Sequence, residues 1–373
     1  MRIGIIGGGI GGLAAAIALA RRGVASSVFE QAPGLARVGA DINLTPNAVR
    51  ALDGIGVGDR IRETAAQPAF RISRTWNTGE ETSRLPMSSA AEERYGAPQL
   101  TMHRADLLAA LTEAAPRGCL ELGRRLVAVE ERPDGVTAEF ADGATEELDL
   151  LVGADGIHSR VRTAMLGEER PEFTGVVAYR AVVPLSAVPP GLPNLDSFTK
   201  WWGPRPEIQI VSFPLNQGKD LFIFATTHQD SWREESWTCP GDVAELRAAY
   251  AGFHEEARAL LGACSEVLKS ALYVRDPLPR WSTHRMTLLG DACHPMMPFM
   301  AQGAGQAVED AVVLARALTE GSAPLDERLR HYEDTRKERT ERIQLGSREN
   351  SWLKDAGTGD WVYGYDAWST PLA

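Results

Sequence analysis

The first twelve residues read MRIGIIGGGIGG, a short apolar strand that runs into a glycine-rich turn. Residues 13–22 are rich in alanine and leucine and predict a helix, and a second strand ends at Glu30. In this pattern Gly7 permits a tight turn, Gly9 lets a pyrophosphate touch the backbone, and Gly12 lets the helix pack closely on the strand. The order and spacing predict a Rossmann-like dinucleotide-binding unit.

The end of the second strand indicates which dinucleotide is bound. Glu30 stands about twenty residues after the turn, where a carboxylate accepts hydrogen bonds from the hydroxyls of an adenosine ribose. Gln31 follows at the position where a 2′-phosphate would call for arginine. The expected nucleotide is therefore FAD or NAD, and not NADP.

A second glycine-rich region reads LLGDACHPMMPFMAQGAGQAVED over residues 288–310. Asp291 follows an apolar strand and is suited to bind sugar hydroxyls, and Gly303 with Ala304 precedes a helix expected over residues 306–319. The positive end of that helix suits a phosphate or the negative charge of a reduced flavin ring. The alternative is an ordinary strand, loop and helix corner whose glycines serve packing.

Two further stretches carry candidate nucleotide ligands. Asp155 lies in GADGIHSRVR (residues 153–162), in a glycine-flanked turn at the carboxyl end of an apolar strand, which is a typical ligand-facing position. The alternative role for Asp155 is to cap the helix expected over residues 159–166, and both roles can hold. Arg104 lies in the run HRAD (103–106), which caps a helix expected over residues 107–114, and its candidate partners are a pyrophosphate and Asp106.

Composition excludes several classes of partner. The chain has 373 residues with 50 acidic and 39 basic side chains, a net charge of −11, which argues against a nucleic-acid or anionic-membrane partner. No apolar run approaches the roughly 18 residues of a membrane span, and no signal peptide precedes the first strand, so we expect a cytoplasmic protein. The four cysteines are scattered without a CxxC pair, which predicts reduced thiols and no metal site.

The chain changes character after residue 172. Strand-like runs at residues 176–183, 197–202, 207–213 and 221–227 precede a helical stretch at 243–261, after which the chain returns to the first domain. We therefore expect an α/β fold in which a dinucleotide domain (1–70, 99–172 and 275–320) is interleaved with a smaller, mostly antiparallel substrate domain (71–98 and 173–274). Residues 321–373 form a C-terminal helix and an aromatic tail, and the charged run at 326–342 is expected to be a solvated helix face. A cleft between the two domains is the expected site.

Three motifs together resemble the single-component (group A) FAD-dependent aromatic hydroxylases, which have the para-hydroxybenzoate hydroxylase fold and include salicylate hydroxylase. They are GGGIGG with Glu30, GADGIHSRVR, and LLGDACHPM with MAQGA, in the family's order along the whole chain. Shorter runs look like the 6-hydroxynicotinate 3-monooxygenase branch: EQAP (30–33), NTG (77–79), SRLP (83–86), KWW (200–202) and WVYGYD (361–366).

The resemblance implies FAD held by the residues named above, with the flavin ring against Gly303 and Ala304. NADH or NADPH would reduce the flavin, O2 would add to give a C4a-hydroperoxide, and a small phenolic or hydroxypyridine acid would be hydroxylated, with or without decarboxylation. Only one nucleotide fingerprint is present, so the nicotinamide donor must visit transiently. The enzyme would be a monomer or a homodimer. The alternatives are an FAD oxidase or dehydrogenase that does not use NAD(P)H, and a non-catalytic FAD-binding sensor.

The chain departs from that branch around the expected substrate. Asn43, Phe299 and the pair Glu207 and Val211 replace histidines and a tyrosine of the branch, and Asp41 replaces a glycine. These departures leave the ring substrate open.

Candidate catalytic residues follow from the strand at 207–213. Glu207, Gln209 and Val211 would share one face, with Glu207 as a base or solvated and Gln209 as an orienting group. Asn43 is a further candidate. Tyr179 either hydrogen-bonds the substrate or is a satisfied core tyrosine. Met296, Pro298 and Phe299 are expected to form the pocket wall and to exclude water.

Overall fold

A parallel sheet of five strands organises the first domain of the computed structural model, which describes residues 1–35, 41–232, 239–354 and 359–373. Residues 37–40, part of the stretch that precedes Asn43, lie outside the described residues. The strands, in order across the sheet, are β17 (Met286–Leu288), β11 (Leu150–Gly153), β1 (Ile3–Ile6), β2 (Ser26–Glu30) and β7 (Leu120–Leu122). All carboxyl ends therefore meet at one edge, where the glycine turn follows β1.

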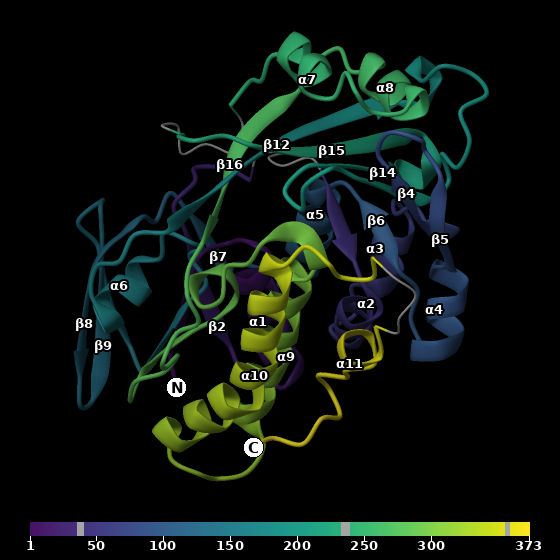
Figure 1. Cartoon of the computed structure of the whole chain (residues 1–373). Coiled ribbons are helices and arrows are strands. Elements are labelled where there is room, and N and C mark those ends of the chain that lie inside the picture. Colours follow the sequence, from purple (N-terminus) through teal and green to yellow (C-terminus); the bar gives the residue numbers. More distant parts are fainter. Residues whose placement is uncertain (36–40, 233–238, 355–358) are drawn as a thin grey trace.

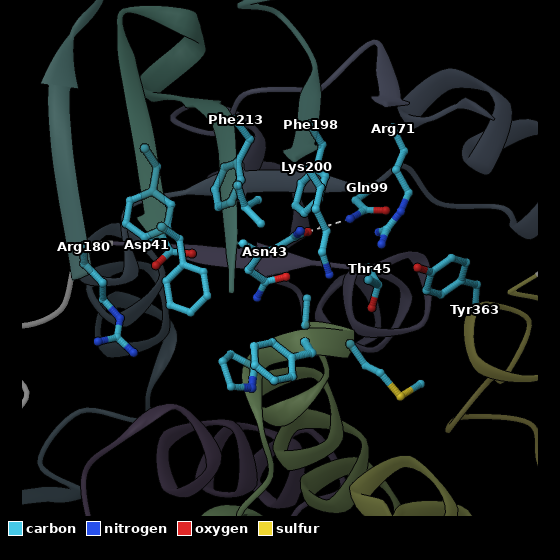
Figure 2. Close-up of a pocket in the computed structure, with 18 residues that line it drawn as sticks. Asp41, Asn43, Thr45, Arg71, Gln99, Arg180, Phe198, Lys200, Phe213 and Tyr363 are labelled. Atoms are coloured by element: carbon cyan, nitrogen blue, oxygen red, sulfur yellow. Dashed lines mark hydrogen bonds between the residues drawn. The ribbon is translucent and has the colours of Figure 1, made fainter. Parts of the chain in front are cut away.

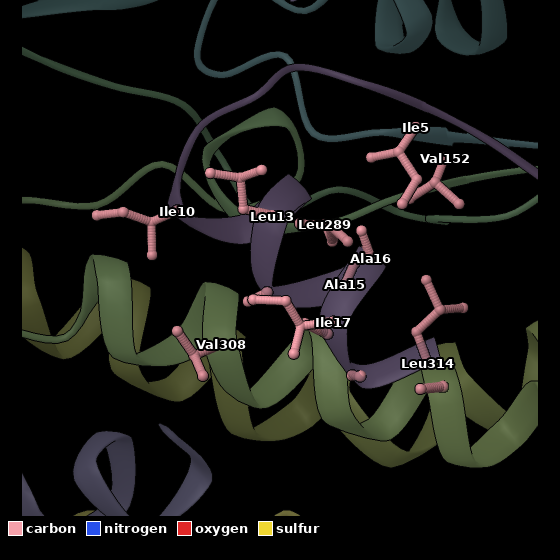
Figure 3. Close-up of a cluster of buried hydrophobic side chains, with 14 of the residues drawn as sticks. Ile5, Ile10, Leu13, Ala15, Ala16, Ile17, Val152, Leu289, Val308 and Leu314 are labelled. Carbon is pink, nitrogen blue, oxygen red and sulfur yellow. The ribbon is translucent and has the colours of Figure 1, made fainter. Parts of the chain in front are cut away.

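Two helices carry the core of this domain, α1 (Ile10–Arg21) and α9 (Gly303–Thr319). Ile10 and Ile17 of α1 lie on the side of Val308 of α9 (Figure 3), and Leu13 belongs to the same buried cluster. The alanines of α1 are almost all fully buried, and such small side chains let the two helices approach closely. The long helix α10 (Leu325–Arg348) packs on α9 in turn (Figure 1). The head of α9 is thereby fixed beside the glycine turn.

The second sheet is mostly antiparallel, as predicted. Its seven strands, in order, are β16 (Leu268–Val274), β12 (Glu172–Pro184), β15 (Asp220–His228), β14 (Gln209–Leu215), β13 (Phe198–Trp202), β4 (Phe70–Thr75) and β5 (Glu81–Pro86). The one parallel contact joins β13 to β4, which is far away in sequence. The interleaved α/β fold expected from the sequence is confirmed.

One face of the second sheet is covered by α7 (Val243–Ala249) and α8 (Glu255–Gly262), at the top of Figure 1. A helical stretch over residues 243–261 was expected, and the structure divides it into these two helices. The helix is interrupted at residues 250–254, where the rings of Tyr250 and Phe253 turn inward and pack edge to face at 5.1 Å. Burial of these two rings accounts for the break.

The remaining elements connect the layers and line their edges. A two-stranded sheet of β3 (Ile42–Leu44) and β6 (Leu100–Met102) lies close to the cavity described below. The others are α2 (Pro46–Gly54), α3 (Gly58–Arg62), α4 (Ser88–Tyr95), α5 (Arg104–Ala114), β8 (Leu126–Arg132), β9 (Gly135–Phe140), β10 (Thr145–Leu148), α6 (Arg160–Leu166), η1 (Leu185–Ala187), η2 (Asn216–Gly218), η3 (Gly290–Ala292), η4 (Pro298–Met300) and α11 (Asp360–Tyr363). Within the described ranges, no helix is both long and apolar enough to cross a membrane.

Helix α10 is not solvated all round, contrary to the expectation for its charged run. Arg336 is fully buried and donates hydrogen bonds to Asp310 Oδ1 at 2.8 Å and to Glu309 Oε2 at 2.6 Å. His294, also buried, is 2.6 Å from Asp310 Oδ2 through Nε2. Burial alone would raise the pKa of Asp310, but His294 and Arg336 bring it down to about 2. A charged cluster thus fixes α10 to α9.

Candidate active site

The three glycine-bearing motifs meet at the carboxyl edge of the parallel sheet. Gly7 has φ 108°, and a Cβ on it would lie 2.4 Å from the carbonyl oxygen of Ala154, so only glycine fits there. A Cβ on Gly11 would lie 2.7 Å from Leu289 and 3.3 Å from the Cβ of Ala307. The turn that follows β1 therefore touches both of the other motifs.

The start of α1 is shaped to receive an anion. A Cβ on Gly12 would lie 1.9 Å from the carbonyl oxygen of Gly7, so helix and strand close up as the fingerprint requires. Among the described residues, a Cβ on Gly9 would meet nothing within 4 Å, and none of their side chains caps this helix. The first N–H groups of α1 thus face open space, which fits a pyrophosphate at the positive helix end.

Glu30 and Gln31 lie at the end of β2 and just beyond it. The Glu30 carboxylate accepts hydrogen bonds from the backbone N–H of Gly8 at 2.7 Å and of Ala32 at 2.8 Å. These bonds fix the carboxylate against the turn while it stays half exposed. It can therefore still accept hydrogen bonds from ribose hydroxyls.

Asp155 has the capping contacts that were the alternative to its ligand role. Its carboxylate accepts hydrogen bonds from the Ser159 hydroxyl at 2.5 Å and from the N–H of Arg160 at 2.7 Å and of Val161 at 3.3 Å. Burial raises the pKa of Asp155 in spite of these donors. A ligand role for Asp155 stays a prediction.

Asp291 and the head of α9 form the other wall of the nucleotide groove. Asp291 is exposed in η3, and its Oδ1 lies 3.9 Å from where a Cβ on Gly303 would sit. Helix α9 begins at Gly303, three residues earlier than expected, and no side chain caps it. Open N–H groups, a neighbouring carboxylate and the absence of a Cβ suit a flat, polar ring system. The residues present fit FAD.

A cavity that is partly open to solvent lies between the second sheet and the loop that precedes α9. Asn43, Gln209, Val211, Pro298 and Phe299, all predicted site residues, line it. Three other predicted residues do not line it. They are Met296, which packs beside Met300, and the two catalytic candidates Glu207 and Tyr179.

Glu207 does not share a strand face with Gln209, contrary to prediction. Strand β14 begins only at Gln209, and Glu207 lies in the preceding turn. Its Oε1 is 3.0 Å from Nε of Arg205, which is 56% exposed. The structure thus supports the solvated alternative for Glu207.

Tyr179 is a core residue. It is 1% exposed and faces α7 and α8, whereas its neighbour Arg180 points to the cavity side of β12. Burial and a hydrogen bond to Glu245 raise the pKa of Tyr179. The structure therefore supports the role of a core tyrosine and not that of a substrate contact.

Two buried cations of the cavity, Lys200 near its middle and Arg71 at one end, were not predicted. Lys200 donates to Asn350 Oδ1 at 2.7 Å, and Arg71 donates to the carbonyl oxygen of Trp352 at 3.1 Å and lies 5.1 Å from the ring centroid of Phe198. Among the described residues, neither cation pairs with a carboxylate. Burial, reinforced by Arg71 nearby, lowers the pKa of Lys200 well below its usual range, and burial lowers that of Arg71.

Asp41 and Arg180 lie at the other end (Figure 2). Burial raises the pKa of Asp41 to about 6, although Arg180, Arg104 and His103 oppose the rise. Burial lowers the pKa of Arg180 to about 10, partly offset by Asp41. Arg104 therefore stands near Asp41, while its reach to a pyrophosphate stays a prediction. A departure of Asp41 from the family pattern was noted in the sequence, but the residue was not predicted to be in the site.

The aromatic tail closes the cavity and packs on its own chain. Tyr363 of α11 lines the cavity next to Arg71 (Figure 2). Its carbonyl oxygen accepts a hydrogen bond from Arg50 at 2.9 Å, and Trp368 Nε1 donates to the carbonyl of Ala51 at 3.3 Å. The described part of the tail therefore belongs to the site and is anchored on α2.

Fold and site together define a flavin-dependent oxidoreductase, because a dinucleotide groove lies beside a cavity that is lined by aromatic side chains. A family model described as "FAD binding domain" matches residues 1–345. A 6-hydroxynicotinate 3-monooxygenase of Bordetella bronchiseptica is 42% identical over 373 residues, which cover 100% of this chain and 97% of the relative.

Solved structures agree with this likeness. A salicylate hydroxylase substrate complex superposes with a TM-score of 0.85 at 28% identity, covering 98% of this chain and 96% of the other. The HpxO protein of Klebsiella pneumoniae, complexed with FAD and uric acid, has a TM-score of 0.83 at 28% identity and covers 97% and 90%. The chain belongs to the FAD-binding family of aromatic hydroxylases: it is an FAD-dependent monooxygenase, and NAD(P)H is the usual reductant of this family.

Proposed function

We propose that this enzyme hydroxylates the ring of a small aromatic or N-heteroaromatic acid that carries a ring hydroxyl. The observation that carries the proposal is the pair of buried cations, Arg71 and Lys200, in a cavity walled by Phe198 and Phe213. A buried cation without a carboxylate partner is costly, and a ligand carboxylate would relieve that cost. An anionic ring compound fits both features.

The names of the relatives support the same class. 6-Hydroxynicotinate and salicylate, named for two relatives, each combine a ring hydroxyl with a carboxylate. We propose a substrate of this kind, phenolic or hydroxypyridine, whose hydroxylation proceeds with or without loss of the carboxylate. Asn43 and Gln209 would orient its ring through hydrogen bonds, since both side chains line the cavity.

The cofactor would lie in the groove described above. Bound FAD, reduced by NADH or NADPH, supplies the oxygen chemistry with O2. We propose that the chain holds FAD through Gly7, Gly9, Gly12, Glu30, Gln31, Arg104, Asp155 and Asp291, with the ring at Gly303 and Ala304. Phe299 and Pro298 would keep water from the reacting ring, because both stand between the cavity and the head of α9.

The test is turnover across a substrate panel. The purified yellow protein is given NADH or NADPH with 6-hydroxynicotinate, salicylate, 3-hydroxybenzoate and benzoate, while oxygen uptake and product mass are measured. Substrate-stimulated oxidation with a product that gains one oxygen is expected for hydroxy acids and not for benzoate. Oxidation of a substrate without NAD(P)H would support an oxidase or dehydrogenase instead, and binding without any reaction would support a sensor.

Location and assembly are part of the proposal. All four cysteines are free, in agreement with a reducing compartment, and we propose a cytoplasmic monomer or homodimer. Cell fractionation and light scattering test these two points.

A further inference from the structure

Asp41 is the only carboxylate among the described residues that line the cavity. We infer that Asp41 accepts the proton of the substrate's ring hydroxyl, an inference that rests on the proposed function. The residue directly precedes β3, so Asp41, Asn43 and Thr45 alternate with buried apolar neighbours and point to the same side. All three line the cavity, in that order from one end toward the other.

The charges of the cavity define how a hydroxy acid would lie. Figure 2 shows Asp41 at one end and Arg71 at the other, with Asn43 and Lys200 between them. A substrate whose carboxylate is held by Arg71 and Lys200 extends its ring past Asn43 toward Asp41. The amide of Asn43 is itself fixed, because its Oδ1 accepts a hydrogen bond from Gln99 at 2.6 Å. The far end of the ring is therefore where a hydroxyl would meet the carboxylate.

Asp41 is surrounded by groups that keep it ionised while burial makes it more basic. Arg180 faces it from β12, and Arg104 and His103 face it from the start of α5. Burial nevertheless raises the pKa from 3.8 to about 6. A phenol has a pKa of about 10. Proton transfer from a phenol to an ordinary aspartate is therefore unfavourable by about six orders of magnitude, and transfer to Asp41 by only about four. Asp41 is thus a base above pH 6 and a stronger one than an ordinary aspartate.

The step is a simple proton transfer. The O–H bond of the ring hydroxyl breaks and an O–H bond to Asp41 forms, while the electron pair stays on the ring oxygen and spreads to the ortho and para carbons. That ring becomes the better nucleophile toward activated oxygen. The negative charge moves from Asp41 to the ring oxygen, where Arg180, beside Asp41, would stabilise it, and the proton leaves later through the part of the cavity that is open to solvent.

A carboxylate at this position has another conceivable use, which is only to neutralise Arg180. The effects of Asp41→Asn distinguish a neutralising role from the role of a base. A merely neutralising aspartate affects FAD content and folding, whereas a base also sets the pH profile and the protonation state of the bound ligand. General bases contribute about 10²- to 10⁴-fold to rate.

The experiment uses the FAD-loaded enzyme and the panel compound that best stimulates NADH oxidation. In the wild type we expect kcat/KM to fall below a pH of about 6. Asp41→Asn should lower kcat at pH 7 by at least 100-fold and remove the acid limb. Asp41→Glu, which keeps a carboxylate, should restore part of the rate and an acid limb of the pH profile, at a pH different from that of the wild type.

Glu245→Gln is the matched control, because this carboxylate lies beyond the opposite face of the same sheet, paired with Lys269 at 2.7 Å. It should leave the rate and the acid limb unchanged. An acid limb at the same pH in wild type and either Asp41 variant would overturn the inference, as would a kcat at pH 7 that is equal in wild type and Asp41→Asn. Should no panel compound stimulate the wild type, the proposed function itself has failed, which separates the two failures.

Discussion

Lys200 donates a hydrogen bond of 2.7 Å from Nζ to Oδ1 of Asn350, so a buried cation of the seven-stranded sheet is held by a residue that follows α10. Asn350 adopts a left-handed backbone conformation with φ 48°, and its Nδ2 lies 3.3 Å from Oε1 of Gln209. Its amide group therefore bridges the cation and an expected orienting residue. The position of Lys200 in the cavity depends on the end of the chain.

Replacing Lys200 by Met should weaken substrate binding. A hydrogen bond to a charged group contributes about 1.5–3 kcal/mol, so KM for the hydroxy acid should rise about 10- to 100-fold, with a smaller change in kcat. Steady-state kinetics on the variant measure this. Lys354→Met is the control: this lysine is exposed, 5.4 Å from the ring of Trp202, and its loss should leave KM almost unchanged. Equal KM values in wild type and Lys200→Met would contradict the carboxylate anchor.

Alanine at the glycines of the first turn should separate folding from cofactor binding. Gly12→Ala places a Cβ 1.9 Å from the carbonyl of Gly7, so we expect loss of soluble, folded protein. Gly9→Ala meets no protein atom within 4 Å at an ordinary φ of −76°, so the protein should fold but lose FAD. Circular dichroism and flavin absorbance after gel filtration distinguish these outcomes. Gly34→Ala, equally unobstructed, should remain yellow.

Asp291→Ala should lower FAD affinity. The exposed carboxylate beside Gly303 is expected to bind cofactor hydroxyls, and a lost hydrogen bond to a charged group amounts to roughly 10- to 100-fold in Kd. Fluorescence titration of the apoprotein with FAD gives the value. An unchanged Kd would mean that this carboxylate does not touch the cofactor.

Glu207→Gln should leave kcat, KM and the pH profile as they are. The side chain lies in a turn outside the cavity and pairs with an exposed arginine, and exposed ion pairs contribute little. A fall in turnover with a displaced pH profile would return Glu207 to the role of base.

Asp310→Asn should destabilise the protein in a pH-dependent way. Removing one charge of a buried cluster leaves Arg336 partly unpaired and should cost about 3–5 kcal/mol at pH 7. The pKa of Asp310 falls from 3.8 to about 2 on folding, so its stabilisation is present above pH 4 and is lost as the pH falls toward 2. Urea unfolding of apoprotein at pH 7, 5 and 3 should therefore give a difference between wild type and variant that shrinks at low pH. Asp334→Asn, exposed on α10, should give none.

Local patterns allowed the fold to be predicted. The backbone conformation at Gly7, the close approach at Gly12 and the acid at Glu30 all act within one strand, turn and helix, so spacing alone indicates them. Side chains also alternate between the two faces of a strand as predicted, but only within the residues that form the strand. Glu207 was placed wrongly because the pattern extends past the true start of β14 into a turn, which spacing cannot reveal.

The residues missed in the sequence depend on contacts between distant segments. Whether Tyr179 or Arg180 faces the cavity follows from which face of β12 is covered by α7 and α8, and nothing on the strand itself encodes that. Lys200 on β13 and Arg71 on β4 look like surface residues of their strands until the segment after α10 covers them. Arg336 likewise lies in a highly charged run, and only the packing of α10 on α9 buries it.

The parallel pairing of β4 with β13 restricts how this enzyme could exchange parts with its relatives. Residues 70–86 supply β4 and the edge strand β5 to a sheet whose other strands come from residues 172–274, so neither segment makes a complete sheet. Consider a recombinant that takes residues 172–274 from a relative and keeps its own residues 70–86. The foreign β13 would then have to fit the native β4 at every side chain along their contact, including Arg71. We expect ring specificity in this lineage to evolve by point substitution in the cavity more readily than by gene shuffling.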